Sequence, residues 1–336
     1  MVTTEPLNFI PVLLGTDSNV YGMARSFHEA YGVKSVAVGK ARLSATSDSR
    51  IVTVEAVEPN LEEDAVFCDT LIRFAARYPG KELLLVPCGD NYIKLLVRNQ
   101  EALRPYYRFE CIGEDLLMRL SMKESFYQVC TEHGFAFPKT ATCTKENYRD
   151  IALPFDFPVI VKPSNSVAYW NCRFPHKKKV FVAENQAEFS AILTAIYGSS
   201  YQDPLIIQEY IPGDDSNMRV MNCYCGSDRR VRLIALGHAL LEEHSPEGIG
   251  SYAAIITAHD EALSQRMRAF LEAVGYVGFA NFDMKLDPRD GQYKLFEMNL
   301  RQGRSSYYVT AAGYNLAKWL VEDVLLHKDA PDHRFQ

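Results

Sequence analysis

The first third of the chain alternates between short apolar runs and longer stretches whose apolar residues recur with helical spacing. The runs FIPVLLG, VKSVAVG and ELLLVPCGD predict strands, and DSNVYGMARSFHEAYG and NLEEDAVFCDTLIRFAARYPG predict the helices between them. Strands that alternate with helices pair in parallel and are joined by right-handed crossovers. The pattern therefore predicts a parallel α/β sheet in this part of the chain.

Ligands of such sheets bind outside the carboxyl ends of the strands, where the loops GTDSN and CGDN lie in this sequence. Neither loop has the GxGxxG spacing of a dinucleotide site. Each loop taken alone is more commonly a tight turn with an Asx cap. As a pair at one sheet edge, the loops offer these candidates for substrate contact: Asp17, Asn19, Gly89 and Asp90.

The segment LSMKESFYQVCTEHG predicts a helix with a capping box, in which Ser121 is the N-cap and Glu124 lies three residues on. Lys123 then lies in the first turn, where a cation opposes the helix dipole and an anion is favoured by free N–H groups. A phosphate bound near Lys123 explains this position. The alternative is an exposed lysine that swings away from the helix end at a small cost.

A buried strand, FPVIVKPSNS, carries Lys162 near its end, and the strand KVFVAEN follows after a long loop. The two strands predict a hairpin joined by residues 164–178. A long, polar and basic loop over a sheet is suited to cover phosphates. A solvated connection is the alternative, and the lysine run 177–179 alone favours it.

Further along, PLIIQEYIPGDDSNMRVMNCYCG predicts two strands with a break at Pro212 and Gly213. A buried break between two lobes presents backbone groups to a base, and it presents Asp214 or Asp215 to ribose hydroxyls. Taken alone, the segment indicates no more than a turn.

Two alternating runs, FANFDMKLDPRDGQ and YKLFEMNLR, predict a β-hairpin near the end of the chain, with its turn at PRDG. Each strand has one apolar face and one polar face. A register that pairs Leu286 with Lys294 places Asp283 opposite Glu297, at roughly 5 Å between Cβ atoms. The polar face of the hairpin then holds two facing carboxylates.

Facing carboxylates destabilise a hairpin unless a cation lies between them. Mg²⁺ is the simplest candidate, because it takes oxygen ligands from one or two carboxylates and completes its shell with water and substrate phosphates. The same register brings Asn281 opposite Asn299. Asp283, Glu297 and Asn299 together suggest a metal–nucleotide site. The alternative is a solvated outer face, which is the more common state of alternating strands.

Composition narrows the function classes. A chain of 336 residues is long enough for two or three lobes, and a net charge of −6 gives no electrostatic footprint for nucleic acid. The sequence has no basic leader and no run of roughly 20 apolar residues, which predicts a cytoplasmic protein without membrane insertion. The eight cysteines include no CxxC pair and the eight histidines no HExxH motif, so reduced thiols are expected and metal chemistry is left to carboxylates.

Four elements occur in one order: a lysine at the head of a helix, a strand lysine before a loop, the QEYIPGDD break and the Asp/Glu/Asn hairpin. In this order they resemble the ATP-grasp superfamily, over residues 11–324. The resemblance implies an α/β and α+β architecture, the ATP-grasp fold, in which two lobes hold ATP. The implied divisions are a Rossmann-like N-terminal domain (1–118), a small lobe with a flap hairpin (119–204) and a large lobe with the metal-binding hairpin (205–336).

The resemblance also implies roles for single residues. The implied ATP contacts are Lys123, Lys162, Gln208, Glu209, Tyr210, Ile211, Asp214 and Asp215. Of these, Gln208 to Ile211 are the implied adenine-binding linker. The implied ligands of two Mg²⁺ ions, with Mn²⁺ as an alternative metal, are Asp283, Glu297 and Asn299. The implied catalytic residues are Lys162 and Arg301, of which Arg301 steadies the phosphoryl group. Arg219 is a further catalytic candidate, which completes the acceptor side or acts in a lid, and surface pairing explains it equally well.

Further residues are candidates for substrate contact. The sequence after Arg301 offers donors for a substrate carboxylate at Arg304, Ser305 and Ser306. The segment EEHSPEGIG, with Glu243 and His244, completes the acceptor side or acts as a lid. Surface pairing or helix capping explains each of these residues equally well.

Two features depart from many members of the superfamily. The flap begins SNSVAYW, without glycine, and Leu300 stands in place of the proline of E-x-N-P-R. The segments EMNLRQGRSSYYVTAAG and LLEEHSPEGIG most resemble the carboxylate–amine ligases of the D-aspartate ligase group. That group joins D-aspartate to the lysine amine of a peptidoglycan precursor.

The implied reaction begins when a substrate carboxylate attacks the γ-phosphate of ATP, and an amine then displaces phosphate from the acyl phosphate. Positioning and electrostatics suffice for phosphoryl transfer, so no nucleophilic Cys or Ser is needed. Two alternatives stay open: an ATP-grasp enzyme of another class, such as a carboxylase or an amino-acid kinase, and an inactive ATP-binding regulatory protein. The expected partners are a small carboxylate and an amine, and a homodimer is only the commonest default.

Overall fold

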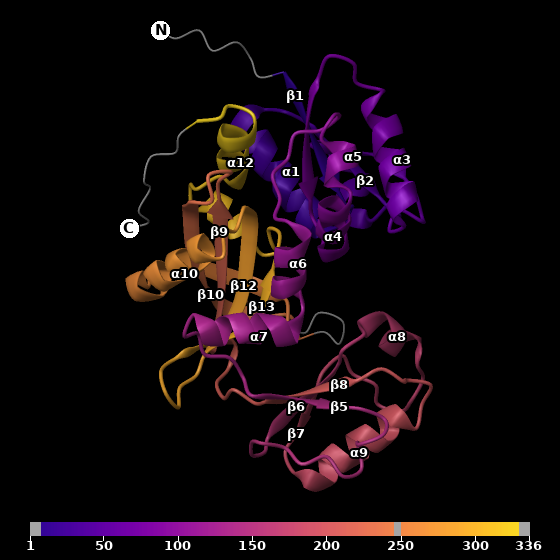
Figure 1. Ribbon diagram of the computed structural model, residues 1–336, viewed down its shortest axis with the longest axis vertical. Coiled ribbons are helices and arrows are strands. Elements are labelled where there is room, and N and C mark those ends of the chain that lie inside the picture. Colours follow the sequence, from indigo (N-terminus) through magenta and orange to yellow (C-terminus); the bar gives the residue numbers. More distant parts are fainter. Residues whose placement is uncertain (1–7, 245–249, 329–336) are drawn as a thin grey trace.

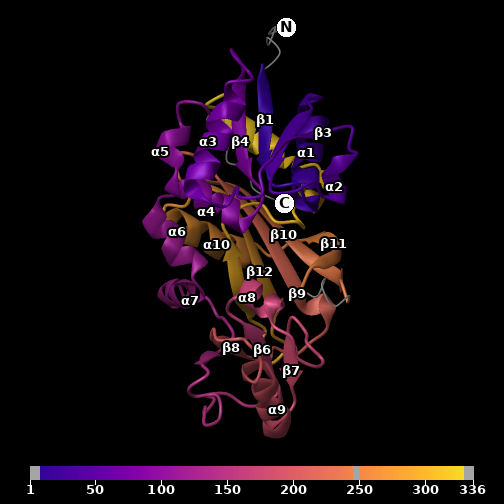
Figure 2. The same ribbon diagram turned by 90° about the vertical axis from the view of Figure 1, so that its right-hand side faces the viewer.

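The structure, a computed structural model, describes residues 8–244 and 250–328. Figure 1 shows a parallel sheet at one end of the molecule, a large antiparallel sheet in the middle and a small antiparallel sheet at the other end. Figure 2 shows the same order after a turn of 90°. One parallel sheet and two antiparallel sheets agree with the predicted α/β and α+β architecture.

The N-terminal sheet is parallel, as the alternating pattern predicts. Its strands are β1 (Phe9–Leu14), β2 (Ser35–Gly39), β3 (Val52–Val57) and β4 (Glu82–Pro87), in the order β3-β2-β1-β4. The helices of this part are α1 (Ser18–Tyr31), α2 (Ser44–Ser47), α3 (Asp64–Ala75), α4 (Asp90–Arg98) and α5 (Gln100–Leu103). Leu13 packs with α1 and Leu14 shares the core of α3, so β1 is buried on both faces.

The large sheet is antiparallel and carries the predicted hairpin. Its strands are β9 (Met218–Cys225), β10 (Val231–Glu242), β11 (Tyr252–Ala258), β12 (Gly278–Leu286) and β13 (Tyr293–Asn299), in the order β11-β10-β9-β12-β13. The short 3-10 helix η1 (Asp215–Asn217) precedes β9. On one face, Phe282 and Met284 are buried with Phe270 of α10 (Glu261–Ala273). That face is apolar, which leaves the other face for polar residues.

The small sheet has a core of its own. Its strands are β5 (Thr140–Cys143), β6 (Val159–Pro163), β7 (Phe181–Ala183) and β8 (Leu205–Glu209), in the order β5-β8-β6-β7. The helix α9 (Gln186–Tyr197) packs on one face, and α8 (Ser166–Asn171) lies in the loop between β6 and β7, which form the predicted hairpin. Because β8 pairs with β5 and β6, this sheet extends to Glu209, and the division of the lobes after residue 204 stays a prediction.

The predicted capping box at Ser121 is wrong. Ser121 is the last residue of α6 (Glu114–Ser121), and Met122 is the extended N-cap of α7 (Lys123–Glu132), with no side-chain cap bond. A helix already precedes this point, so the S-x-x-E pattern marks a junction of two helices. Lys123 is the first residue of α7, and its predicted position in the first turn is confirmed.

The end of the chain returns to the N-terminal sheet. After α11 (Tyr307–Ala311), α12 (Leu316–Val324) lies beside α1, and Leu320 shares a core with Leu13 and Phe27 (Figure 1). This return places the loop between β13 and α11 against the carboxyl ends of β1 and β4. Three parts of the chain therefore contribute to one site.

All eight cysteines are free thiols, as predicted. Burial raises the pKa of the Cys130 thiol to about 12, which keeps it protonated at neutral pH and unsuited to metal binding. Among the described residues, no helix combines the length and the apolar character needed to cross a bilayer.

Candidate active site

The β12–β13 hairpin has the predicted register at its polar end. Asp283 pairs with Glu297, which confirms that two carboxylates face each other. Nearer the turn, the predicted pairing of Leu286 with Lys294 is wrong, because a β-bulge leaves Phe296 without a partner and shifts the register by one residue. Bulges of this kind are frequent beside active sites, where they re-aim side chains.

Asp283 is half-buried in the middle of the polar face. Its Oδ1 accepts a hydrogen bond from the Tyr252 hydroxyl at 2.9 Å, and its Oδ2 accepts one from Asn299 Nδ2 at 3.1 Å. Burial raises the pKa of Asp283, and the Glu297 carboxylate raises it further. A cation bound between the two carboxylates would favour their ionised forms and lower the pKa of Asp283.

The donor set fits Mg²⁺. Among the described residues, no three His, Cys, Asp or Glu side chains gather to hold a metal. Asp283 and Glu297 supply two carboxylates, and Asn299 adds an amide beside them. Mg²⁺ commonly takes only one or two carboxylates from the protein and fills its other positions with water and phosphate oxygens.

A second group of site residues comes from the small sheet. Lys162 on β6 and Gln208 on β8 lie on the face away from α9, and Lys162 Nζ donates to Gln208 Oε1 at 2.9 Å. Burial and the neighbouring Lys123 lower the pKa of Lys162 to about 7, and Glu297 of the large sheet opposes the shift. The structure thus brings the two predicted phosphate lysines together, and it places Lys162 near Glu297 of the carboxylate pair.

Arg301 joins the hairpin to the N-terminal sheet. Its Nη2 donates to Asp90 Oδ2 at 2.8 Å and to Asn299 Oδ1 at 3.3 Å, and its Nη1 donates to Gln302 O at 3.2 Å. Its Nε is buried and has no hydrogen-bond partner within the described ranges. A guanidinium held by three acceptors, with an N–H left over, is suited to bind an anionic group.

The loops after β1 and β4 meet the loop after β13, at the sheet edge where the strand order places a ligand site. Asn19 is buried, and its Nδ2 donates to the carbonyls of Cys88 at 2.9 Å and Gln302 at 3.1 Å. Asp17 accepts backbone bonds as the N-cap of α1, and Gly89 is the N-cap residue of α4. These residues support the loops, whereas Asp90 contacts Arg301 directly.

The predicted adenine linker, Gln208 to Ile211, includes the last two residues of β8 and the two residues after it. Glu209 Oε1 accepts from Arg289 at 2.7 Å, and the Tyr210 ring centroid lies 5.6 Å from Lys285 Nζ. Ile211 is buried. The linker is therefore in contact with the β12–β13 hairpin at Glu209 and Tyr210.

The two carboxylates predicted near a ribose already have partners. Asp214 Oδ1 accepts from the backbone N–H of Ser216 at 2.9 Å and from its hydroxyl at 2.6 Å, which caps η1. Asp215 Oδ2 accepts from the backbone N–H of Glu242 at 3.0 Å and bonds His244 Nε2 at 2.9 Å. Both carboxylates organise the segment between the lobes, and a ribose contact at either one stays a prediction.

The candidate substrate residues after Arg301 divide into two kinds. Arg304 is exposed and pairs with Glu243 at the end of β10. Ser306 is buried, donates to Asn222 Oδ1 at 2.6 Å and accepts from Gly303 N at 2.6 Å, so it shapes the loop instead of presenting a free hydroxyl. Ser305 is half-buried. Residues 245–249 of the predicted lid lie outside the described residues.

Arg219 does not join the site. It pairs with Met284, whose side chain belongs to the apolar core under α10, whereas Asp283 pairs with Val220. Neighbouring strand positions point to opposite faces, so Arg219 lies on the face away from the carboxylate pair. Its Nη1 donates to Ser216 O at 2.6 Å, and we assign it no catalytic role.

The sequence analysis missed a chain of hydrogen-bonded amide side chains beside the carboxylate pair. Asn299 Nδ2 donates to Asn281 Oδ1 at 3.1 Å, and Asn281 Nδ2 donates to Asn222 Oδ1 at 3.0 Å. Asn222 also accepts from Ser306, so the chain links the hairpin to the substrate loop. A polar residue in the otherwise apolar strand VMNCYC is the signal that marks Asn222.

The chain has relatives of known sequence. No family model matches the chain. Over 335 residues the chain is 47% identical to a D-aspartate ligase of Enterococcus faecium, an alignment that covers 98% of this chain and 79% of the relative. A carbamoyl phosphate synthase large chain of Pyrococcus furiosus is 24% identical over 224 residues, with 63% of this chain and 20% of the relative covered.

Solved structures show the same fold. An L-amino acid ligase of Bacillus licheniformis has a TM-score of 0.65 at 15% identity and covers 96% of this chain and 75% of its own. A biotin carboxylase of Campylobacter jejuni in complex with β-γ-ATP has a TM-score of 0.64 at 14% identity, with coverage of 96% and 72%. The chain therefore belongs to the D-aspartate ligase family of ATP-grasp enzymes and is an ATP-dependent ligase.

Proposed function

We propose that this enzyme joins the carboxylate of an amino acid such as D-aspartate to an amine of a peptide or cell-wall precursor, through an acyl phosphate. The observation that carries the proposal is electrostatic. Asp283 faces Glu297 across the hairpin, Asn299 bonds both Asp283 and Arg301, and Lys162 lies near Glu297, so two carboxylates and two cations lie together. Such a group suits an anionic phosphoryl donor and its metal. The name of the 47% identical relative supplies the choice of D-aspartate.

The proposed reaction has two steps. A carboxylate oxygen of the substrate attacks the γ-phosphorus of ATP, the bond to the β-γ bridging oxygen breaks, and ADP leaves. The amine nitrogen then attacks the acyl carbon, the bond to the phosphate oxygen breaks, and phosphate leaves as the amine loses a proton. Neither step needs a covalent bond to the enzyme, so positioning and charge carry the catalysis.

Each site residue has a role in this scheme. Lys123 and Lys162 bind phosphate oxygens, and Arg301 binds the phosphoryl group as it moves to the carboxylate. Mg²⁺ held by Asp283, Glu297 and Asn299 would offset charge on the phosphates. Arg304 and Ser305, at the loop beside Arg301, are the proposed contacts of the substrate carboxylate. We further propose that the small lobe ends after Glu209. Because the proposed reaction consumes ATP, we also propose that the enzyme works in the cytoplasm.

The lowered pKa of Lys162 predicts that ATP binding depends on pH. Without ATP the ammonium loses its proton at about pH 7, whereas anionic phosphates favour the protonated form. ATP binding therefore takes up a proton above pH 7, and affinity falls by up to about tenfold per pH unit until the pKa of the bound state is reached. Calorimetric Kd values from pH 6 to pH 9, in buffers of different ionisation enthalpy, measure both quantities.

The matched variant is Lys162→Met, which removes the titrating group. It should bind ATP more weakly at pH 6 and should lack proton uptake between pH 7 and pH 9. A wild-type Kd that is constant over this range, with no proton uptake, would show that Lys162 stays charged without ATP.

The function itself is tested by release of ADP and phosphate. The assay supplies Mg²⁺ and ATP with a panel of amino acids that includes both aspartate enantiomers, with and without lysine-containing peptides and cell-wall precursors. Turnover that needs both a carboxylate and an amine, and a new amide in the mass spectrum, are the expected results. A phosphorylated or carboxylated product would instead place the enzyme in another ATP-grasp class.

A further inference from the structure

The turn between β12 and β13 is held by an ion pair that the catalytic scheme does not use. The Asp287 side chain is only 1% exposed, and Arg289 donates to it from Nε at 2.9 Å and from Nη2 at 2.7 Å. These bonds lower the pKa of Asp287, which keeps the carboxylate ionised. The backbone closes the turn, because Asp287 N donates to Gln292 O at 2.9 Å. Arg289 is thus fixed on the large lobe.

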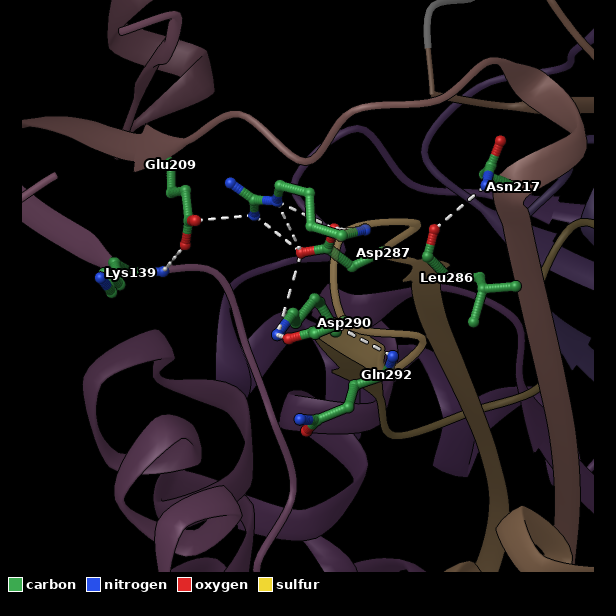
Figure 3. Close-up of polar contacts among 9 residues, drawn as sticks. Lys139, Glu209, Asn217, Leu286, Asp287, Asp290 and Gln292 are labelled. Carbon is green, nitrogen blue, oxygen red and sulfur yellow. Dashed lines mark hydrogen bonds and ion pairs between the residues drawn. The ribbon is translucent and has the colours of Figure 1, made fainter. Parts of the chain in front are cut away.

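The same guanidinium also reaches the small lobe. Arg289 Nη2 donates to Glu209 Oε1 at 2.7 Å, and the other oxygen of Glu209 accepts from Lys139 N at 3.2 Å (Figure 3). Glu209 is the last residue of β8 and belongs to the proposed adenine linker, Gln208 to Ile211. One arginine therefore bridges two carboxylates that belong to different sheets, a geometry that its planar fork suits.

Two further bonds fasten the linker to the same hairpin. Lys285 Nζ donates to Gly213 O at 2.7 Å, and Asn217 Nδ2 donates to Leu286 O at 3.2 Å. Gly213 has φ +103°, and a Cβ there would lie 2.4 Å from Asn217 Oδ1, so the close approach requires glycine. Residues 209–217, which include the end of the linker and the segment after it, are thus bonded to the hairpin at three points.

The other end of this hairpin carries Asp283 and Glu297. We propose that Arg289 is a positioning residue. By binding Glu209, it sets the position of the adenine-binding linker relative to the carboxylate pair, Asp283 and Glu297. The inference rests on the proposed binding of ATP between these elements. It assigns to Arg289 an effect on the base of the nucleotide and a much smaller one on the phosphates, because Arg289 bonds Glu209 and Asp287, whereas Lys162 bonds Gln208.

The experiment compares two ligands by calorimetry with Mg²⁺ present: ATP, and inorganic tripolyphosphate, which lacks the base. Arg289→Ala is expected to raise the Kd for ATP about tenfold, a value that allows for the exposure of the arginine. The Kd for tripolyphosphate should stay within about twofold. In steady-state assays KM for ATP should rise by more than kcat falls.

Two more variants keep the test sharp. Glu209→Gln leaves the pair of Arg289 with the buried Asp287 intact, and it should weaken ATP binding in the same selective way. The double variant should lose less than the product of the two single effects. The control is Arg98→Ala, which removes an Arg–Asp pair of similar geometry, 3.1 and 3.0 Å to Asp64, and should alter neither Kd.

Each outcome decides between distinct readings. Equal weakening of ATP and tripolyphosphate, or an unchanged Kd for ATP in both Arg289→Ala and Glu209→Gln, would overturn the positioning role while leaving the proposed function in place. A wild-type protein that binds tripolyphosphate and ATP equally well would refute recognition of the base by the linker. A wild-type protein that binds neither ligand would refute the proposed nucleotide site itself.

Discussion

Replacement of Glu297 by glutamine is expected to lower kcat by about 10²- to 10³-fold, because the amide is a weak ligand for the metal that offsets charge in phosphoryl transfer. The half-saturating concentration of Mg²⁺ should rise at the same time. ADP release at saturating ATP and substrates measures kcat, and a titration with Mg²⁺ measures the second effect. The structural basis is the direct pairing of Glu297 with Asp283.

A measurement of Tm shows whether the loss of activity in Glu297→Gln is caused by unfolding. Glu297 raises the pKa of Asp283, so the ionised pair opposes folding, and stability falls as pH rises between the unfolded-state and folded-state pKa values of Asp283. The variant lacks that repulsion, and without metal its Tm at neutral pH should match or exceed that of the wild type. Glu101→Gln, at a side chain that is 90% exposed on α5, is the control and should change neither kcat nor Tm. Near-normal activity with an unchanged Mg²⁺ requirement would exclude Glu297 as a ligand.

The facing carboxylates were predictable because two alternating strands and a short turn leave few registers that bury the apolar face. The bulge at Phe296 was not predictable, since an added residue at this point leaves the local pattern almost unchanged. The face of Arg219 was hidden for a different reason. Strand β9 is buried along most of its length and shows no clear alternation, so the sequence does not indicate which side chains point to the site.

Local signals also failed where tertiary contacts decide. The S-x-x-E pattern at Ser121 is a capping box only if no helix precedes it. Here Ser121 is the last residue of α6, so the pattern caps no helix. The edge strand β11 was missed, although Tyr252 on it bonds Asp283, because its residues are half-exposed and lie after a glycine-rich segment. The Arg289–Glu209 bridge joins residues 80 positions apart, and no periodicity encodes such a contact.

The loss of Arg301 is expected to have the second large effect. Arg301→Met should lower kcat by about 10³-fold, because a guanidinium that binds the moving phosphoryl group acts mainly in the transition state. Arg301→Lys should recover little, since an ammonium cannot reach Asp90, Asn299 and the phosphoryl group at once. Single-turnover measurement of ADP formation isolates the phosphoryl step, and calorimetry gives the Kd for ATP.

Asp90→Asn tests how much the orientation of the Arg301 guanidinium matters while its charge is retained. It keeps an acceptor for Arg301 Nη2 but weakens the bond at 2.8 Å, so kcat should fall by only about tenfold. If Arg301 acts on the transition state, the Kd for ATP changes little in all three variants. The single-turnover rate is then reduced least in Asp90→Asn, more in Arg301→Lys and most in Arg301→Met. A parallel rise in the Kd for ATP would instead assign Arg301 to ground-state binding of the nucleotide, and the phosphoryl step would then depend on the lysines and the metal alone.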